Sequence, residues 1–254
     1  MDLLEITDGK NTEDCIRFVD DMTIIAEGTN LQEAFEKLAA IMTRKAGGQE
    51  WAMLYDCKFA LDKFGLMGLT KWQEWDPMNA KKTRPITRPT IKLGNHIIKP
   101  TTTHKFLGII IDQELCFKEH VNYALEKGNK FVGQYQRLTK PSRGATAKHM
   151  CQYYIAVAIP RMLYTTDIFL IPGSARNKGT KGHINELARI KRQATLAITG
   201  AMKTTANDTL DMHVNLLPFH LLVSKIVHRA ATRLACLPDN HPLPKHILRH
   251  PRNM

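Results

Sequence analysis

Two adjacent aspartates, Asp20 and Asp21, are the residues of this sequence best suited to chemistry. They separate two runs of β-prone residues, 15–19 and 22–26, which predicts a β-hairpin with both carboxylates at its tip. Carboxylates near apolar side chains need a cation, because desolvating unpaired negative charge is costly. Mg²⁺ is commonly held by one or two carboxylates and substrate phosphates, as in nucleotidyl transfer. The alternative is a turn exposed to water, where aspartate is also common.

The elements expected to position this hairpin belong to an α+β part of the chain. A helix is predicted to begin at Thr29 or Asn30 and to continue to Gly47–Gly48. Short strands are expected within 55–70, a second hairpin at 91–98 and a buried strand at 106–111. The polar, proline-rich segment 71–89 is expected to be a loop.

Beyond Asp112 the apolar residues recur with a helical period. Helices are predicted at 121–138, at 145–164 with a kink at Pro160, at 183–201 and at 218–235, with a basic loop over 172–182. On the third helix, Arg189, Lys191 and Arg192 are expected to face outward. The fold class is therefore α+β: a small antiparallel sheet with a helix, followed by an all-α part.

Composition restricts the class of protein. The chain has 254 residues, of which 43% are hydrophobic and 24% charged, which argues against a disordered, collagenous or coiled-coil protein. The formal net charge of +12 favours a polyanionic partner, nucleic acid before an anionic membrane. Five scattered cysteines, no signal peptide and no long apolar run predict a reduced, soluble, intracellular protein without a membrane partner, and a nuclear location is compatible with this.

A basic face is expected on the first of these helices and the segment after it. Its residues are Lys118, Lys127, Lys130, Arg137, Lys140, Arg143 and Lys148. Such a face can follow the phosphates of a nucleic acid without reading its sequence. The alternative is an ordinary solvated helix face rich in lysine.

The order of several motifs resembles a known family. Phe18-Val19-Asp20-Asp21 resembles the aromatic-x-Asp-Asp hairpin of reverse transcriptases. Segments 57–66 and 104–112 resemble later palm motifs of the non-LTR (LINE-like) retrotransposon enzymes, and segments 154–164 and 190–201 resemble their thumb and connector. The resemblance covers almost the whole chain.

The resemblance implies a division into three parts. Residues 1–112 would be the C-terminal part of the palm, 113–182 a helical thumb, and 183–254 a helical connector with a polar tail that precedes an absent RNase H domain. The implied activity is RNA-directed DNA polymerisation, with Mg²⁺ as cofactor and an RNA or DNA template-primer as partner.

The resemblance also implies roles for single residues. Asp20 would be a metal ligand, Asp21 its partner, and Phe18 the aromatic residue beside the nucleotide. Lys63 would lie near the nucleotide phosphates, although a lysine beside a strand is equally well a solvated charge. Phe106, Leu107 and Gly108 would face the primer end.

One departure from the family affects activity. In these polymerases another metal-binding aspartate ends an apolar strand upstream of the hairpin, and none of Asp2, Asp8 or Asp14 matches it. Removing one ligand from a two-metal site leaves weak metal binding and misaligned oxygens. We therefore expect this chain alone to be inactive, with an exposed apolar palm surface, and expect the missing N-terminal segment in trans as a partner. Two alternatives are a noncatalytic nucleic-acid-binding remnant that uses the basic thumb, and a basic helical interaction protein.

Overall fold

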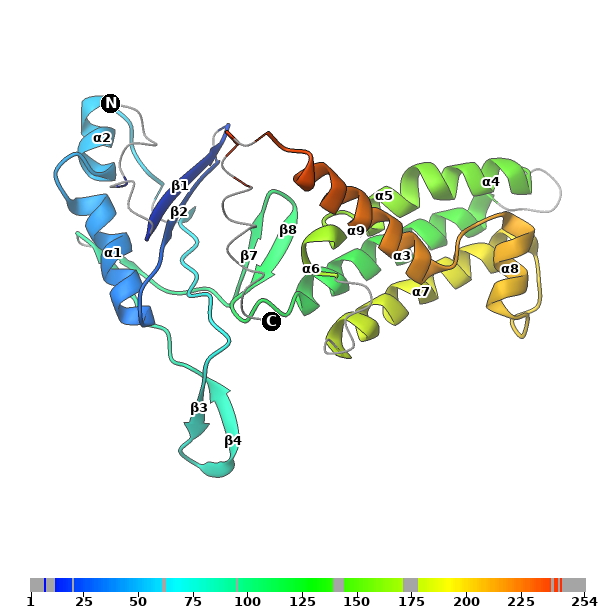
Figure 1. Ribbon diagram of the computed structural model, residues 1–254, viewed down its shortest axis with the longest axis horizontal. Coiled ribbons are helices and arrows are strands. Elements are labelled where there is room, and N and C mark those ends of the chain that lie inside the picture. The colour runs from blue at the N-terminus through cyan, green and yellow to red at the C-terminus, as the bar shows by residue number, and fades with distance from the viewer. Residues whose placement is uncertain are drawn as a thin grey trace. The chain divides into compact units, whose positions relative to one another are not determined.

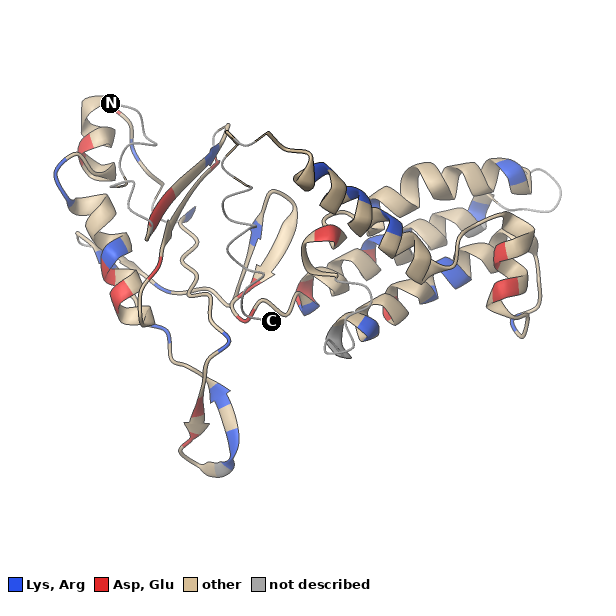
Figure 2. Ribbon diagram, viewed as in Figure 1, with Lys and Arg blue, Asp and Glu red and all other residues tan. Residues whose placement is uncertain are grey.

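The chain forms two compact units, Met1–Leu115 and Cys116–Met254. A computed structural model (Figure 1) describes residues 7, 12–19, 21–60, 63–94, 96–138, 144–170, 178–238, 240–241 and 243. The first unit combines hairpins with two helices and the second is helical, so the α+β class is confirmed. Figure 2 marks lysine and arginine positions in both units, but the basic excess lies in the second: residues 1–115 hold 15 Lys and Arg against 17 Asp and Glu, and residues 116–254 hold 21 against 7.

The first unit contains four β-hairpins and two helices in its described residues. Its elements are β1 (Glu13–Phe18), β2 (Asp21–Ala26), α1 (Leu31–Thr43), α2 (Gly48–Leu54), β3 (Gln73–Asp76), β4 (Asn79–Pro85), β5 (Ile91–Leu93), β6 (His96–Ile98), β7 (Thr103–Phe106) and β8 (Ile109–Asp112). Consecutive strands pair antiparallel as β1–β2, β3–β4, β5–β6 and β7–β8, and each pair is a separate two-stranded sheet. The predicted hairpins at 15–26 and 91–98 are confirmed.

Helix α1 forms the centre of this unit because its apolar face contacts two hairpins. Phe35 and Met42 pack with Ile91 and Leu93 of β5. Ile41, which is fully buried, packs against β2. Two-stranded sheets are marginal by themselves, so the helix supplies the apolar contacts that β1–β2 and β5–β6 need.

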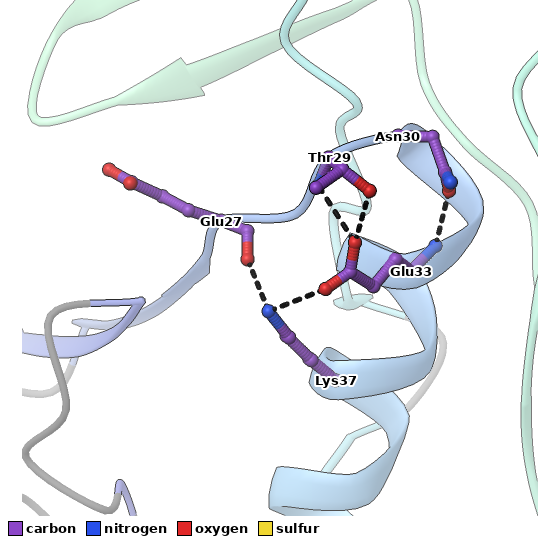
Figure 3. Close-up of polar contacts among 5 residues, drawn as sticks. All are labelled: Glu27, Thr29, Asn30, Glu33 and Lys37. Carbon is purple, nitrogen blue, oxygen red and sulfur yellow. Dashed lines mark hydrogen bonds and ion pairs between the residues drawn. The ribbon is translucent and has the colours of Figure 1, made fainter.

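The start of α1 is a capping box, shown in Figure 3. The Asn30 side chain accepts a hydrogen bond from the Glu33 N–H at 2.8 Å. The Glu33 carboxylate in turn accepts from the backbone N–H and the hydroxyl of Thr29 at 2.8 and 2.6 Å. It also pairs with Lys37 at 2.9 Å, and the Lys37 ammonium donates to the carbonyl of Glu27. These bonds lower the pKa of Glu33 to about 2, and they confirm the predicted N-terminus.

Several expectations for the first unit were wrong. Helix α1 ends at Thr43 and a second helix, α2, begins at Gly48 with Gly47 as its N-cap. The segment 71–89 holds the hairpin β3–β4 where a loop was expected. The described residues within 55–70 form no strand, and only a single bridge from Leu66 to Pro100 lies there.

Two glycines let the segment 55–70 approach its neighbours without a strand ladder. A Cβ at Gly65 would lie 2.5 Å from the ring of His104, and one at Gly68 would lie 3.1 Å from Phe35. The backbone therefore approaches its neighbours more closely than a residue with a side chain would allow. In the sequence, an apolar run that packs closely without pairing has the same pattern as a strand.

The apolar run 106–111 was expected to be one strand and is instead the hairpin β7–β8. Its turn residues, Leu107 and Gly108, have φ values of +46° and +88°. Positive φ at both central residues is the type I′ pattern of a two-residue hairpin. Gly108 adopts this conformation without strain, and the sequence signal of a turn was masked by the apolar Leu107.

The second unit is helical throughout its described residues. Its elements are α3 (Lys118–Leu138), α4 (Ala147–Tyr153), a π-helix (Tyr154–Ala158), α5 (Ile159–Met162), α6 (Thr166–Phe169), α7 (Lys178–Thr199), α8 (Asn207–Val214) and α9 (Phe219–Ala235). The four predicted helices are confirmed, but α7 begins at Lys178, so the described end of the segment 172–182 is helical where a loop was expected. The disturbance expected at Pro160 takes the form of the π-helix, in which the N–H of Ile159 donates to the carbonyl of Tyr154.

One hydrophobic cluster holds the second unit together. Tyr135 of α3, Tyr154 of the π-helix and Leu187 of α7 are fully buried in it, and Val223 of α9 completes it. The helices before and after residue 182 therefore share one core. In the part of the chain that the structure describes, no helix is both long and apolar enough to cross a membrane.

The expectation that Lys191 faces outward was wrong. Its ammonium donates to the carboxylate of Asp211 at 2.6 Å and to the carbonyl of Leu217 at 2.5 Å, and the two charged side chains are only 5% and 12% exposed. Arg192 is half-buried and donates to the carbonyls of Lys203 and Thr205. Both cations stabilise the connection from α7 to α8, and a helical pattern alone cannot reveal such partners.

Candidate nucleic-acid and metal site

The acidic hairpin turns one residue earlier than the sequence indicates. Phe18 pairs with Asp21 across the strands, so the turn begins at Val19 and Asp21 is the first residue of β2. Val19 has a φ of +56°, as a tight turn requires. Asp20 lies outside the described residues. Asp21 is therefore a strand residue with a fixed direction, rather than part of the tip.

Alternation along the strands gives this hairpin two different faces. Met22, Ile24 and Ala26 pack against α1. Asp21 and its cross-strand neighbour Phe18 lie on the opposite face.

This outer face is open and largely apolar. Phe18 is 56% exposed and Ile16 is 50% exposed, while Asp21 and Ile25 are also exposed. The outer face of the hairpin thus exposes several apolar side chains. It places one carboxylate beside an aromatic ring on a face that a ligand or another protein segment can reach.

The base of the hairpin is held to α1. The guanidinium of Arg44, at the end of α1, pairs with the carboxylate of Glu13 at 3.0 Å, and both side chains are mostly buried. Next to Glu13, the N–H of Glu27 donates to the carbonyl of Thr12 and closes the base of the hairpin. The direction of the Asp21 strand is therefore set by contacts at its base, and its tip is left open.

The donor set can be compared with what Mg²⁺ needs. Two consecutive aspartates fit a site that also draws on substrate phosphates. A two-metal site needs more carboxylates, and no group of three or more His, Cys, Asp or Glu able to hold a metal occurs among the residues that the structure describes. The described part of the hairpin offers one of the two proposed carboxylates, that of Asp21.

The segment that contains Lys63 contacts the hairpin that contains Phe106, Leu107 and Gly108. Lys63 is exposed and follows directly on 61–62, which lie outside the described residues. Two residues later, Gly65 packs beneath His104 of β7, and the Leu66 carbonyl accepts two hydrogen bonds from Thr101. The segment that bears Lys63 is thereby attached to the hairpin β7–β8.

The turn of that hairpin is accessible. Leu107 is exposed, and Phe106 and Gly108 are half-buried. The sequence-predicted residues of the first unit thus fall into one group on β1–β2 and another on segment 63–66 with β7–β8.

The basic face of α3 is exposed but partly neutralised. Lys118, Lys127, Lys130, Arg137 and Lys148 are all exposed, while Lys140 and Arg143 lie outside the described residues. Lys130 pairs with Glu126 at 2.6 Å, and this hydrogen bond raises the pKa of Lys130.

Lys127 is also engaged within the helix. Its ammonium lies 4.1 Å from the centre of the Tyr123 ring, a cation–π contact. Two of the cations expected to meet phosphates therefore already have partners.

Helix α9 carries a basic ridge that the sequence analysis missed. Lys225, Arg229 and Arg233 are exposed and spaced by four residues, so they form one row with about 6 Å between neighbours along the axis. Figure 2 shows these basic positions along α9 without an acidic one. The sequence contains no Asp or Glu from 212 to 238, and this gap, combined with the four-residue spacing, was the available signal. We call this row the α9 ridge.

Comparison with known proteins gives one distant relationship. No family model matches the chain, and no solved structure matches it. The chain is 18% identical over 184 residues to an RNA-directed DNA polymerase from the mobile element jockey of Drosophila funebris. The aligned region covers 72% of this chain but only 18% of the length of that polymerase. The chain is therefore distantly similar to a retrotransposon reverse transcriptase.

Proposed function

We propose that the chain derives from a retrotransposon reverse transcriptase and binds a template-primer of RNA or DNA. The observation that carries this proposal is the similarity to the jockey polymerase, because it extends over 72% of the chain. The non-LTR palm, thumb and connector assignments of 1–112, 113–182 and 183–254 belong to the same proposal.

In this proposal the outer face of β1–β2 is the catalytic side of the palm. Asp20 and Asp21 would hold Mg²⁺, which polarises phosphoryl oxygens when it is bound. Phe18 lies beside Asp21 and supplies an apolar wall against a nucleotide. Lys63 would meet nucleotide phosphates, and the turn Phe106–Gly108 would meet the primer end.

The helical unit would bind the phosphate backbone. The α9 ridge supports this role because its three cations are exposed and no acidic residue of α9 opposes them. Lys118, Arg137 and Lys148 add exposed positive charge on α3 and α4. Contacts of this kind give binding that is salt-dependent and indifferent to sequence.

We also propose that these 254 residues alone do not extend a primer. Nucleotidyl transfer by two metals needs a further carboxylate to align the attacking and leaving oxygens. A reverse-transcriptase segment that supplies this carboxylate in trans is the expected partner, and adding it should restore extension. The second candidate function, noncatalytic nucleic-acid binding, is favoured by the α9 ridge, which needs no metal.

The metal part of the proposal is tested with Mn²⁺ as a paramagnetic probe. In the presence of an RNA–DNA primer-template, traces of Mn²⁺ should broaden the amide NMR signals of Phe18 and Asp21. The Asp20→Asn and Asp21→Asn variants should lose this broadening. Asp14→Asn is the matched control because Asp14 is an exposed aspartate at the far end of the same hairpin. Equal broadening in all variants, or none in the unaltered chain, would refute the metal site.

Activity is tested by primer extension with Mg²⁺. No extension is expected from the chain alone. Extension that persists in Asp20→Asn would identify a contaminating polymerase, whereas extension that this substitution abolishes would contradict the proposed inactivity.

A further inference from the structure

The hairpin β3–β4 is a ribbon that lacks the apolar support of the other elements. No described side chain of β3 or β4 is buried, and Figure 1 shows the ribbon as a separate projection of the first unit. Hydrogen bonds across the strands hold it, from Arg84 to Glu74 at 2.9 Å and from Thr83 to Gln73 at 2.5 Å. An isolated two-stranded ribbon is marginal in water, so a bound partner would stabilise it.

The ribbon exposes three of the largest apolar side chains in the chain. Trp72 is 66% exposed, Trp75 is 69% exposed and Met78, at the turn, is 98% exposed. Tryptophan is usually buried because of its large apolar area, and several together on the surface mark an interaction site.

The charges around these side chains select an anionic partner. Lys71, Lys81 and Lys82 are exposed, whereas the acidic groups of the ribbon are engaged within it. Glu74 pairs with Arg84, and the Asp76 carboxylate accepts from the N–H of Met78 at 3.0 Å. The surface offered to a partner is therefore cationic and aromatic.

The side chain of Arg88 connects the base of the ribbon to the segment that precedes it. The guanidinium of Arg88 donates to the carbonyls of Gly68 at 3.1 Å and Ile86 at 2.8 Å. Burial lowers the pKa of Arg88, and the nearby carboxylate of Glu114 partly offsets this effect. The ribbon thus extends from a fixed point of the first unit.

We propose that β3–β4 binds single-stranded nucleic acid, with Trp72 and Trp75 stacked on bases and Lys71, Lys81 and Lys82 on phosphates. Indole faces can stack only on bases that are not already stacked in a duplex, so the strand must be single. The inference rests on the proposed function, since an unpaired strand beside a primer-template is the expected source. It adds a site that none of the predicted residues provides.

Tryptophan fluorescence of the full chain tests this directly. The variant Trp51→Phe leaves only the two ribbon tryptophans as emitters, because the chain has three tryptophans. Oligo(dT) or oligo(U) should quench this emission strongly. Trp75→Ala should weaken binding about tenfold, within the range measured when one stacked base is removed.

The charge contribution is tested with matched double variants. Lys81→Ala/Lys82→Ala should reduce the salt dependence of oligonucleotide binding. Lys45→Ala/Lys99→Ala removes the same charge from exposed sites of the first unit outside the ribbon and should leave it nearly unchanged. Circular dichroism of each variant confirms that it folds.

Three outcomes would overturn the inference. They are no quenching by oligonucleotides, quenching that Trp75→Ala does not weaken, and quenching by vesicles rich in anionic lipid but not by oligonucleotides. Binding of a duplex primer-template, measured separately, tests the proposed function. If oligonucleotides quench the emission but the duplex does not bind, only the proposed function is refuted. If the duplex binds but oligonucleotides do not quench, only the proposed binding of single strands by β3–β4 is refuted.

Discussion

Buried polar groups in the helical unit differ in whether they have a partner. The hydroxyl of Tyr135 donates to the carbonyl of Met150, whereas the buried hydroxyl of Tyr154 has no partner in the described part of the chain. Burial raises the pKa of both phenols, so both are neutral near pH 7. A buried hydroxyl without a hydrogen-bond partner costs desolvation free energy, and a phenylalanine at the same position would not have this cost.

The two tyrosines therefore give a matched pair of variants. Tyr135→Phe should destabilise the helical unit by about 1 kcal/mol, because it removes a made hydrogen bond. Tyr154→Phe should be neutral or slightly stabilising. Urea denaturation followed by circular dichroism measures both, and an equal decrease in stability in the two variants would show that Tyr154 is hydrogen-bonded in solution.

His120 gives the helical unit a dependence on pH. The side chain is only 3% exposed, and this burial lowers the pKa of the imidazole. The positive charge of Lys127 lowers the pKa further, whereas a hydrogen bond to the Tyr164 carbonyl raises it in part. The unfolded chain therefore takes up this proton at a higher pH than the folded chain does. The neutral imidazole of His120 therefore makes its full contribution to stability above about pH 6.5, the ordinary histidine pKa. This contribution is lost as the pH falls through the lowered pKa of His120 in the folded chain.

His120→Gln should remove that part of the pH dependence. Thermal unfolding of the unaltered chain and the variant, compared at neutral and at mildly acidic pH, measures it. Between neutral and mildly acidic pH, the Tm of the unaltered chain should fall by more than the Tm of the variant. A constant difference would contradict the buried, neutral imidazole.

At the scale of elements, the capping box stabilises the start of α1, the helix on which the acidic hairpin packs (Figure 3). Asn30→Ala should cost about 1 kcal/mol, because it removes the cap of the first turn. The measurement is chemical denaturation of the first unit, with exposed Gln32→Ala in the same turn as control. An unchanged midpoint for Asn30→Ala would show that the cap is not formed in solution.

Elements with local signals were predictable from the sequence. The cap at Asn30, the hairpin at 91–98 and the amphipathic helices each depend on residues within one turn or one period. Lys191 was placed wrongly because its partner, Asp211, is twenty residues away. The β3–β4 ribbon was missed because its strands are polar and held by cross-strand pairs.

The candidate site was predictable only in part. Phe18 and Asp21 are cross-strand neighbours on one open face. The sequence predicted the turn one residue too late and therefore did not predict this pairing. The partners of Lys127 and Lys130 lie four residues away and could have been foreseen from helical spacing. The same spacing reveals the α9 ridge, whose interaction with phosphates stays a prediction.

At the scale of the whole molecule, the chain has two units with separate cores. We expect unfolding in two transitions. Asp211→Asn should move only the transition of the helical unit, by about 3 kcal/mol, because it leaves the buried ammonium of Lys191 unpaired. Calorimetry of the full chain measures this, and a single transition that the substitution shifts as a whole would show that the units unfold together.

The salt dependence of primer-template binding tests the central claim, that the helical unit holds nucleic-acid phosphates. For the full chain, the logarithm of the association constant should fall steeply and linearly with the logarithm of the salt concentration. Lys225→Ala/Arg229→Ala, on the α9 ridge, should reduce the slope by about 2, because each of these cations is expected to neutralise one phosphate.

The matched control is Lys127→Ala/Lys130→Ala, which removes two α3 cations that already have partners. This control should reduce the slope by less than half of the reduction caused by the variant on the α9 ridge. A slope that is flat in the unaltered chain, or that both variants lower equally, would contradict phosphate binding by the α9 ridge.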